Sequence, residues 1–350
     1  MAAAADTIKI GILGASGYTG ADLVRLLAEH PKAAIRVLTA NQQAGQPMRA
    51  VYPHLGALDL PDLIPWEEAD WSALDVVFCG LPHGTTQDIV ARMPRDLTVI
   101  DLSADFRLRD PETYATWYGH AHKALDLQEE AVYGLPELNR EAVRGARLIA
   151  CPGCYPTATL LALVPLVRAG VIQAEDIVVD AKSGVTGAGR KVAQNLLFAE
   201  VGEGVHPYGV GQHRHIPEME QELSAALGAP VALTFTPHLL PMNRGELVTC
   251  YVKLAGGRSA ADLRATLAEG YAGEPFVRVL PEGESPATRH VRGSNHAVIG
   301  VFADRVPGRA IVIAAIDNLV KGSSGQAIQN MNIVHGLPET LGLTQQPMFP

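Results

Sequence analysis

The stretch Ile8-Lys-Ile-Gly-Ile-Leu13, followed directly by Gly14-Ala-Ser-Gly17-Tyr-Thr-Gly20, decides the fold of this chain. Its apolar half predicts a short buried strand, its glycines predict a turn, and a helical pattern runs from Ala21 to Glu29. Such a turn lets backbone N–H groups at a helix start approach a pyrophosphate. The spacing Gly-x-x-Gly-x-x-Gly departs from the strict Gly-x-Gly-x-x-Gly fingerprint, so a purely structural turn is the alternative. The strand, turn and helix together predict a nucleotide-binding unit.

Further apolar runs extend this unit into a parallel sheet. We expect strands at 34–40, 75–80, 97–101 and 148–150, and a helix from about Gln87. In open parallel sheets the loops at the carboxyl ends of the strands line the ligand crevice, which points to the segment from Leu81 to Thr86. Residues 111–147 look irregular, and we infer no function from them.

The end of the second strand bears on the choice of cofactor. An NAD-preferring unit usually places Asp or Glu there to bind the ribose 2′-hydroxyl, whereas here the strand ends on Asn41-Gln-Gln43. The sequence therefore favours NADP(H). Arg36 is the only nearby cation and lies inside the strand, so the anchor of the 2′-phosphate is not identified. Ser16, Thr39 and Asn41 are neutral candidates.

Cys154 lies where a strand gives way to an apolar helix, in Cys151-Pro-Gly-Cys154-Tyr-Pro-Thr157. The Pro-Gly pair ends the strand, and Pro156 is tolerated in a first helical turn. The unpaired N–H groups and the positive dipole end of a helix start favour a thiolate and suit a developing oxyanion. A nucleophile is one interpretation, and a buried spectator thiol is the other, with equal weight from this stretch alone.

Cys151 and Cys154 also form a Cys-x-x-Cys pair, which suits a redox pair or half of a metal site. The other two of the 4 cysteines, Cys79 and Cys250, lie far off in apolar runs typical of strands. The sequence therefore predicts no metal site.

Arg107 follows the strand at 97–101 and suits a bidentate clamp on an anion. A surface arginine paired with Asp105 or Asp110 is the alternative. The loop from Ser183 to Arg190 is made of small residues and ends in a cation, so it permits close approach of a ligand. A flexible connector is the alternative there.

His213 and His215 stand two residues apart, just before a helix expected at 217–227. Imidazole titrates near neutral pH, which makes these residues candidates for proton transfer. A zinc site would need a third or fourth ligand at usable spacing, and none is convincing.

The remaining apolar runs predict a second sheet. Segments 177–182, 231–235, 246–255, 297–303 and 310–316 follow one another without regular alternation with helices, which indicates a mixed or antiparallel sheet. An amphipathic helix is expected within 317–332, opened by a Gly-Ser-rich turn.

The composition excludes several classes of protein. A chain of 350 residues fits two domains, and 47% apolar content suits a globular α/β protein. The net charge of −9 is dispersed, which argues against general nucleic-acid binding. Residues 1–5 lack the features of a signal peptide, and no apolar run reaches the roughly 18 residues of a membrane span. We expect a cytoplasmic protein that contacts neither membrane nor nucleic acid.

Seven motifs, taken together and in their order along the chain, resemble those of the N-acetyl-γ-glutamyl-phosphate reductase family, the arginine-pathway relatives of aspartate-semialdehyde dehydrogenase. The resemblance covers nearly the whole chain. The motifs are Gly14-Ala-Ser-Gly-Tyr-Thr-Gly20, Leu81-Pro-His83, Asp101-Leu-Ser-Ala-Asp-Phe-Arg-Leu108, Tyr133-Gly-Leu-Pro-Glu-Leu138, Pro152-Gly-Cys-Tyr-Pro-Thr157, His213-Arg-His-Ile-Pro-Glu218 and Asp317-Asn-Leu-Val-Lys-Gly322.

The resemblance implies an NADPH-dependent reduction of an acyl phosphate to an aldehyde with release of phosphate. It implies that Cys154 is the nucleophile that holds the acyl group as a thioester and that His215 is the acid/base. Arg107, His213 and Arg190 are the residues it implies for binding substrate and phosphate. Those implied for the cofactor are Gly14, Ser16, Gly17, Tyr18, Thr19, Ser183, Gly184 and Asn318.

The same resemblance implies the organisation of the chain. A Rossmann-type dinucleotide-binding domain is expected from residues 1–152 and 318–350, because the family fold returns the C-terminal helix to it. An α+β catalytic, substrate and oligomerisation domain is expected at 153–317. A homodimer or homotetramer is implied.

Two departures and two alternatives stand beside this interpretation. Many relatives carry Asn at the position of Cys151, so oxidative bridging to Cys154 is a liability here, and many carry a basic residue near Asn41. One alternative is the lysine-pathway homologue acting on a carrier-bound aminoadipyl phosphate, whose thiol loop lacks the Tyr-Pro-Thr continuation. The other is a nucleotide sensor without chemistry, which would not need Cys154, His215 and Arg107 together.

Overall fold

The computed structural model describes residues 7–349, and these divide into two compact units. The first unit comprises the described residues up to Pro152 together with Ser323–Thr344. The second comprises Gly153–Gly322 and the described residues from Gln345 onward. The chain passes from the first unit to the second immediately before Cys154.

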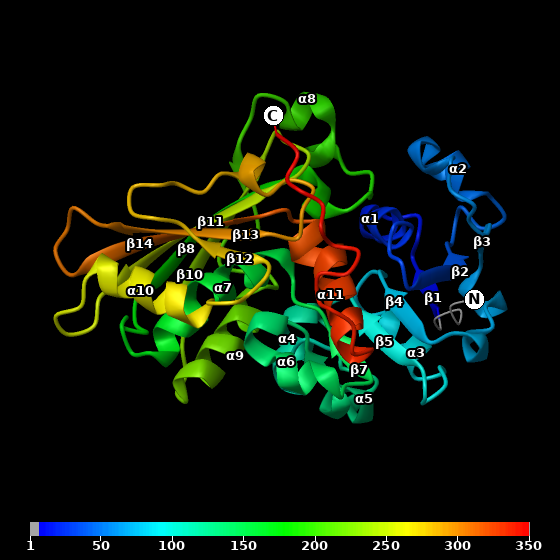
Figure 1. The fold of residues 1–350 in the computed structure, drawn as a ribbon, viewed down its shortest axis with the longest axis horizontal. Helices are drawn as coiled ribbons and strands as arrows, with labels where there is room; N and C mark the ends of the chain where they lie inside the picture. The colour runs from blue at the N-terminus through cyan, green and yellow to red at the C-terminus, as the bar shows by residue number, and fades with distance from the viewer. Residues whose placement is uncertain (1–6, 350) are drawn as a thin grey trace, which may run out of the picture. The chain divides into compact units, whose positions relative to one another are not determined.

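A parallel sheet of seven strands, in the order β3-β2-β1-β4-β5-β7-β6, forms the frame of the first unit (Figure 1). The first strand pairs in parallel with both β2 and β4, so the strand order reverses its direction at β1. Ligands of such sheets bind beyond the carboxyl ends of the strands at this switch point. The strands are β1 (Ile8–Leu13), β2 (Ala33–Thr39), β3 (Leu63–Ile64), β4 (Val76–Cys79), β5 (Thr98–Asp101), β6 (Val132–Tyr133) and β7 (Leu148–Ala150).

The helices of the first unit are short, and two of them pack against the sheet. The first helix packs on β1 and β2, and the last helix contacts α1, α6 and β5. These helices are α1 (Tyr18–Leu27), α2 (Met48–Val51), α3 (Thr86–Val90), α4 (Pro111–Tyr118), α5 (Leu125–Glu130), α6 (Pro136–Arg144) and α11 (Gly325–Val334).

The expectation of an irregular segment at 111–147 is wrong, because it holds α4, α5, β6 and α6. The start of α4 has a local cause. Asp110 is its N-cap, and the carboxylate accepts hydrogen bonds from the N–H groups of Glu112 and Thr113 at 3.4 and 2.9 Å. Pro111 then occupies the first helical position, where its missing N–H costs nothing. These signals are present in the sequence.

The amphipathic helix expected within 317–332 is also corrected by the structure. A π-helical turn at Val320–Ser324 leads into α11, whose residues from Gly325 to Ile333 are all buried. Its polar side chains are buried because they bind other parts of the first unit. The side-chain amide of Asn330 donates to the carbonyl of Gly134 at 2.9 Å, and Asn332 Oδ1 lies 2.9 Å from His30 Nε2.

The second unit is built on a mixed sheet of seven strands in the order β12-β13-β14-β11-β8-β10-β9. Within it, β8 pairs in parallel with β10 and antiparallel with β11, and β11 pairs antiparallel with β14. With the parallel sheet of the first unit, this confirms the predicted fold class. The strands are β8 (Ile177–Gly184), β9 (His206–Pro207), β10 (Leu233–Leu240), β11 (Glu246–Lys253), β12 (Val277–Val279), β13 (Ala297–Ala303) and β14 (Arg309–Ile316).

Helices α7 (Cys154–Arg168), α9 (Ile216–Leu227) and α10 (Ala260–Gly270) lie along one side of this sheet (Figure 1). Burial alternates along β8 and β10, as expected when one face of a sheet is covered and the other is open. The remaining short helix of this unit is α8 (Phe198–Val201).

Helix α7 is the core of the second unit. Twelve of its 15 residues are buried, and it contacts β11, β14, α9 and α10. A helix that is apolar all round is stable only when buried on all sides, and each buried Leu contributes roughly 1.5–3 kcal/mol. Burial of α7 therefore holds its N-terminus, and Cys154 with it, in a fixed place within this unit.

Candidate active site

Cys154 is the first residue of α7, as the sequence predicts, and its side chain is half-buried. Gly153, the N-cap residue, has no side chain to bind the N–H groups of the first turn, which favours a thiolate there. Gly322 packs directly against Cys154, because a Cβ at position 322 would lie only 2.7 Å from the Cβ of Cys154. A glycine is therefore required at 322 for this placement.

His215 comes to the same place from α9. It is the N-cap residue of that helix, and its ring lies on the backbone of Gly153, where an added Cβ would be 2.3 Å from His215 Nε2. The buried carboxylate of Glu218, one turn into α9, accepts a hydrogen bond from the Gly153 N–H at 2.9 Å. The start of α9 thus holds both an imidazole and a carboxylate against the residue that precedes Cys154.

His213 is enclosed by aromatic rings and is neutral at physiological pH. Its ring centroid lies 5.6 Å from that of Tyr155, 5.5 Å from Tyr208, 5.4 Å from Phe235 and 4.7 Å from His215. Burial, reinforced by the nearby Arg214, lowers the pKa of His213 to about 4. The backbone N–H of His215 donates to His213 Nδ1 at 3.2 Å. A neutral ring in this setting positions its neighbours and does not attract phosphate by charge.

Glu246 is the group near Cys154 that the sequence did not predict. It begins β11, its side chain is fully buried, and burial raises its pKa to about 8. The nearby Cys154 side chain has the opposing influence and lowers that pKa. A charged residue at the start of a largely apolar strand was visible in the sequence, but its proximity to Cys154 was not.

Three predicted cofactor residues gather at the end of β8. Asn318 Oδ1 accepts from the Gly245 N–H at 2.8 Å, and Asn318 Nδ2 donates to Thr186 Oγ1 at 3.0 Å. Ser183 is buried, and a Cβ at Gly184 would lie 2.7 Å from the carbonyl oxygen of Asn243. Ser183, Gly184 and Asn318 therefore belong to one compact corner, whereas Arg190 is exposed in the irregular segment after β8.

The glycine turn of the first unit has the geometry that a pyrophosphate needs. Gly14 has a φ of +76°, and a Cβ there would lie 2.6 Å from the carbonyl oxygen of Gly80. Helix α1 begins at Tyr18 with Gly17 as its N-cap, so its first N–H groups have no side-chain cap. Thr19 Oγ1 lies 3.4 Å from Ser323 Oγ, and the Ser16 carbonyl accepts from the Tyr52 hydroxyl. Uncapped N–H groups beside a close backbone approach fit a dinucleotide phosphate.

The candidates for the 2′-phosphate separate in the structure. Thr39 is buried, and its hydroxyl oxygen accepts a hydrogen bond from the Gly14 N–H at 3.3 Å. Arg36 and Asn41 are exposed. Thr39 therefore stabilises the glycine turn, and Ser16 and Asn41 remain as neutral candidates.

Arg107 is almost completely buried, with 7% of its surface exposed. Its Nε donates to the Cys151 carbonyl at 2.8 Å, and its Nη2 donates to the Leu102 carbonyl at 3.0 Å. It is not the surface arginine that the sequence offered as the alternative. At least part of its guanidinium holds the backbone at the ends of β5 and β7.

Cys151 is buried in the first unit, and its Sγ accepts a hydrogen bond from Asn330 Nδ2 at 3.5 Å. All four cysteines are described, and each carries a thiol. Cys79 and Cys250 lie in strands, as predicted. Among residues 7–349, no three or more His, Cys, Asp or Glu side chains are arranged to hold a metal ion.

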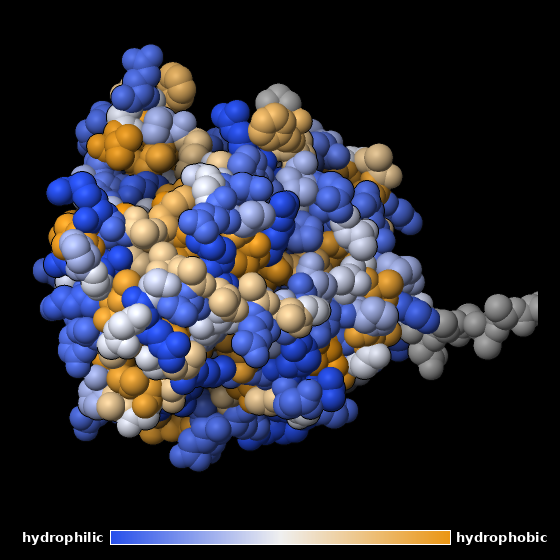
Figure 2. All heavy atoms as spheres, turned by 60° about the vertical axis from the view of Figure 1, so that its left-hand side comes forward, coloured by the Kyte–Doolittle hydropathy of each residue, from blue (hydrophilic) through white to orange (hydrophobic). Residues whose placement is uncertain are grey.

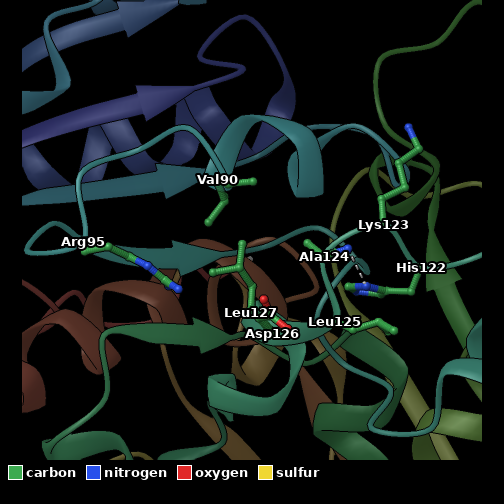
Figure 3. Close-up of a pocket in the computed structure, with 9 residues that line it drawn as sticks. Val90, Arg95, His122, Lys123, Ala124, Leu125, Asp126 and Leu127 are labelled. Atoms are coloured by element: carbon green, nitrogen blue, oxygen red, sulfur yellow. Dashed lines mark hydrogen bonds between the residues drawn. The ribbon is translucent and has the colours of Figure 1, made fainter.

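A hollow of about 470 Å³ in the first unit contains none of the predicted site residues. Figure 3 shows Arg95 at one end of it, Lys123 at the other, and Val90 and Leu127 between them. Both cations are engaged: Arg95 with Glu130 at 2.8 Å and Lys123 with Asp88 at 2.7 Å. Paired cations on an open surface do not indicate an anion site.

Two family models match the chain. Residues 9–146 match the semialdehyde dehydrogenase NAD-binding domain, and residues 154–318 match the semialdehyde dehydrogenase dimerisation domain. The N-acetyl-gamma-glutamyl-phosphate reductase of Rhodospirillum rubrum is 61% identical over 99% of both chains. A probable chloroplastic N-acetyl-gamma-glutamyl-phosphate reductase of Oryza sativa is 54% identical, over 99% of this chain and 83% of the relative.

Solved structures share the fold at low identity. Aspartate semialdehyde dehydrogenase II from Vibrio cholerae, complexed with ASA, aligns with a TM-score of 0.72 and 18% identity, covering 95% of this chain and 99% of that one. The Candida albicans aspartate semialdehyde dehydrogenase with NADP aligns with a TM-score of 0.70 and 19% identity, covering 94% and 99%.

Proposed function

The chain belongs to the N-acetyl-γ-glutamyl-phosphate reductases of the semialdehyde dehydrogenase family, and we propose that it reduces N-acetyl-γ-glutamyl phosphate with NADPH. The products are N-acetylglutamate semialdehyde and phosphate, in a step of arginine biosynthesis. The observation that carries the proposal is the thiol of Cys154 at the start of α7, with the imidazole of His215 on the preceding residue.

In this reaction the Cys154 thiolate attacks the acyl carbon. The C–S bond forms, the C–O bond to phosphate breaks, and the electron pair leaves with phosphate, which gives a thioester. The first-turn N–H groups of α7 stabilise the oxyanion that develops on the acyl oxygen. Addition of hydride then gives a thiohemiacetal, whose collapse releases the aldehyde and the sulfur.

His215 supplies proton transfer on the substrate side of Cys154. It is half-buried at the start of α9 and lies next to the backbone of Gly153, within reach of an acyl group bound to the adjacent sulfur. Glu218 fixes that backbone by accepting the Gly153 N–H. Protonation of the departing oxygen by a positioned imidazole contributes typically about 10²–10⁴ in rate.

We propose Arg107 for the phosphate, as the sequence predicts, together with His213 and Arg190 for the substrate. The contacts of Arg107 with two backbone carbonyls support a second role in fixing the end of β7. The neutral ring of His213 supports a positioning role for it, because charge attraction is excluded by its low pKa.

Bound NADPH supplies the hydride. The glycine turn at Gly14 and the uncapped start of α1 fit its pyrophosphate. We propose that Ser183, Gly184 and Asn318 border its nicotinamide, and that the first unit binds the cofactor while the second carries the chemistry. A cytoplasmic location suits this chemistry, because thiols stay reduced there. Every helix among residues 7–349 is too short or too polar to cross a membrane.

The substrate is tested by the reverse reaction. The purified protein is expected to oxidise N-acetylglutamate semialdehyde in the presence of NADP and phosphate, and to be inactive on carrier-linked aminoadipate semialdehyde. Activity on the carrier-linked compound alone would assign the protein to the lysine-pathway reaction. A labelled acyl group trapped on wild type but absent from Cys154→Ala would rule out a sensor without chemistry.

The open face of the second sheet is our proposed contact with a second copy of this chain. The matching family model is a dimerisation domain, and Val178, Tyr251 and Ile311 lie in register as an apolar row across β8, β11 and β14. Tyr251 is 40% exposed. Figure 2 shows apolar side chains interspersed with polar ones over the surface that it presents. Tyr251→Glu should shift the protein toward monomer in sedimentation velocity, and an unchanged dimer or tetramer would exclude this face.

A further inference from the structure

Glu246 is a fully buried carboxyl group at the nucleophile, and the mechanism above does not use it. As the first residue of β11, it lies opposite Ser183 of β8 and Ile316 of β14 in the sheet, neither of which is ionisable. Among the described residues, neither carboxylate oxygen has a hydrogen-bond partner. Burying a carboxylate without such partners costs several kcal/mol, so this group needs an explanation.

The groups that face Glu246 identify its partner. The Cys154 thiol lies close enough to oppose the rise in the pKa of the Glu246 carboxyl, and the tyrosines at 155 and 208, whose pKa values burial raises, are close enough for the carboxylate to raise them further. The two tyrosines bind each other, with their hydroxyl oxygens 3.0 Å apart. The thiol of Cys154 is thus the proton donor that acts on this carboxyl.

We propose that Glu246 is the immediate acceptor of the Cys154 thiol proton and therefore a catalytic residue. The S–H bond breaks, its electron pair stays on sulfur, and the proton forms an O–H bond on the carboxylate. The pair carries one negative charge before and after this step, so no new charge is created in a buried place. Transfer to neutral His215 would instead create an ion pair.

This role divides the proton chemistry between two sides of Cys154. Glu246 serves the buried side and holds the sulfur's proton, while His215 serves the side open to the acyl group. After acylation Glu246 is uncharged, so no carboxylate beside the thioester opposes hydride addition. When the C–S bond breaks, the electron pair returns to sulfur and restores the thiolate. Glu246 keeps its proton throughout, so the pair ends the cycle in the state in which the thiolate attacked.

The inference rests on Cys154 being the nucleophile of the proposed function, but its test needs no substrate. Iodoacetamide alkylation of Cys154 in the full-length protein is followed by mass spectrometry, which separates this thiol from the other three. Glu246→Gln should slow alkylation at pH 8 about 100-fold, as expected for loss of a positioned base. Glu246→Asp, which keeps a carboxylate, should restore part of the rate. Asp101→Asn, a matched change at another buried carboxyl, should leave it unchanged.

The alkylation rate of the wild type should also rise with pH through the pKa of Glu246, which burial raises to about 8, and Glu246→Gln should lose that dependence. An alkylation rate in Glu246→Gln equal to or faster than wild type would overturn the proposal, since a faster rate means that the carboxylate only repels the thiolate. If Glu246→Gln slows alkylation but the wild type does not turn over N-acetyl-γ-glutamyl phosphate, the proposed role of Glu246 stands and the substrate assignment is wrong.

Discussion

Two buried carboxyl groups, Asp101 at the end of β5 and Glu246 at the start of β11, have opposite surroundings. Both are fully buried, and burial raises their pKa values to about 7 and about 8. Asp101 accepts hydrogen bonds from the N–H and hydroxyl of Ser103, each at 2.9 Å. Neither oxygen of Glu246 has a hydrogen-bond partner among the described residues, and the nearby Cys154 thiol opposes the rise in its pKa.

The difference separates a structural carboxyl from a reactive one. The hydrogen bonds of Asp101 fix the loop after β5, in which Asp105 in turn accepts the N–H groups of Gly84 and Thr86 at 2.6 and 2.9 Å. A change there should alter stability. The carboxylate oxygens of Glu246 have no hydrogen-bond partner among the described residues, so this group is free to accept a proton, and a change there should alter rate.

The largest expected effect on turnover is that of Cys154→Ser, beside the reactive carboxyl Glu246. An alcohol is a far weaker nucleophile and a poorer leaving group than a thiolate, so kcat should fall on the order of 10⁴-fold or more. Steady-state kinetics measures this fall, and thermal unfolding should show a Tm close to wild type. Turnover near wild type would remove Cys154 from the reaction.

The next effect is that of His215→Asn. Loss of the acid/base should lower kcat about 10²–10⁴-fold, and the ionisation of His215 should disappear from the pH profile of kcat. His213→Asn is the matched control, because the pKa of His213 is lowered to about 4 and its neutral ring has only a positioning role. Equal losses and identical pH profiles in the two variants would contradict this division.

The variant Arg107→Lys tests whether Arg107 binds phosphate or has only a structural role. A point charge replaces a bidentate fork, so a phosphate-binding role predicts a rise in KM for the acyl phosphate of about tenfold with KM for NADPH unchanged. A purely structural role, through the carbonyls of Cys151 and Leu102, predicts instead a lower Tm and equal weakening for both substrates. Initial-rate kinetics with each substrate varied separates the two outcomes.

The smallest kinetic effect is expected for Asp101→Asn. The pKa of Asp101 is raised from 3.8 to about 7, so the folded protein binds this proton more tightly than the unfolded chain. The stability that this proton contributes is fully present below pH 3.8 and is lost as the pH rises through about 7. The variant should show a smaller decline of Tm across that interval, measured by calorimetry, with kcat within about twofold of wild type. A large loss of kcat at unchanged Tm would place Asp101 with Glu246.

Local signals in the sequence accounted for much of the fold. The strand β1, the turn at Gly14 and the thiol at the start of α7 follow from contiguous residues, and the structure has them where predicted. The start of α4 has an equally local signal, the Asp110 N-cap followed by Pro111. The buried α11 had none, because its polar residues such as Asn330 are stabilised by partners far away in the chain.

The candidate site divides in the same way. His215 was predicted only through its motif, since nothing in the two imidazoles alone distinguishes it from His213. Tyr208 lies in an irregular segment with no pattern around it, and only the folded chain brings its hydroxyl to that of Tyr155. Glu218 ends the motif that begins at His213, but its hydrogen bond to the Gly153 N–H could not be predicted from spacing.

By itself the sequence determined the family, the two sheet types and the position of the candidate thiol at a helix start, because these depend on short contiguous patterns and on ordered motifs. Only the tertiary structure decided which protons the nucleophile can exchange. Cys154 and Glu246 are brought together by the packing of α7 on β11, a contact between elements distant in sequence. The same packing excludes the water and hydrogen-bond donors that would otherwise stabilise the Glu246 carboxylate, and this exclusion makes the carboxyl a proton acceptor for sulfur.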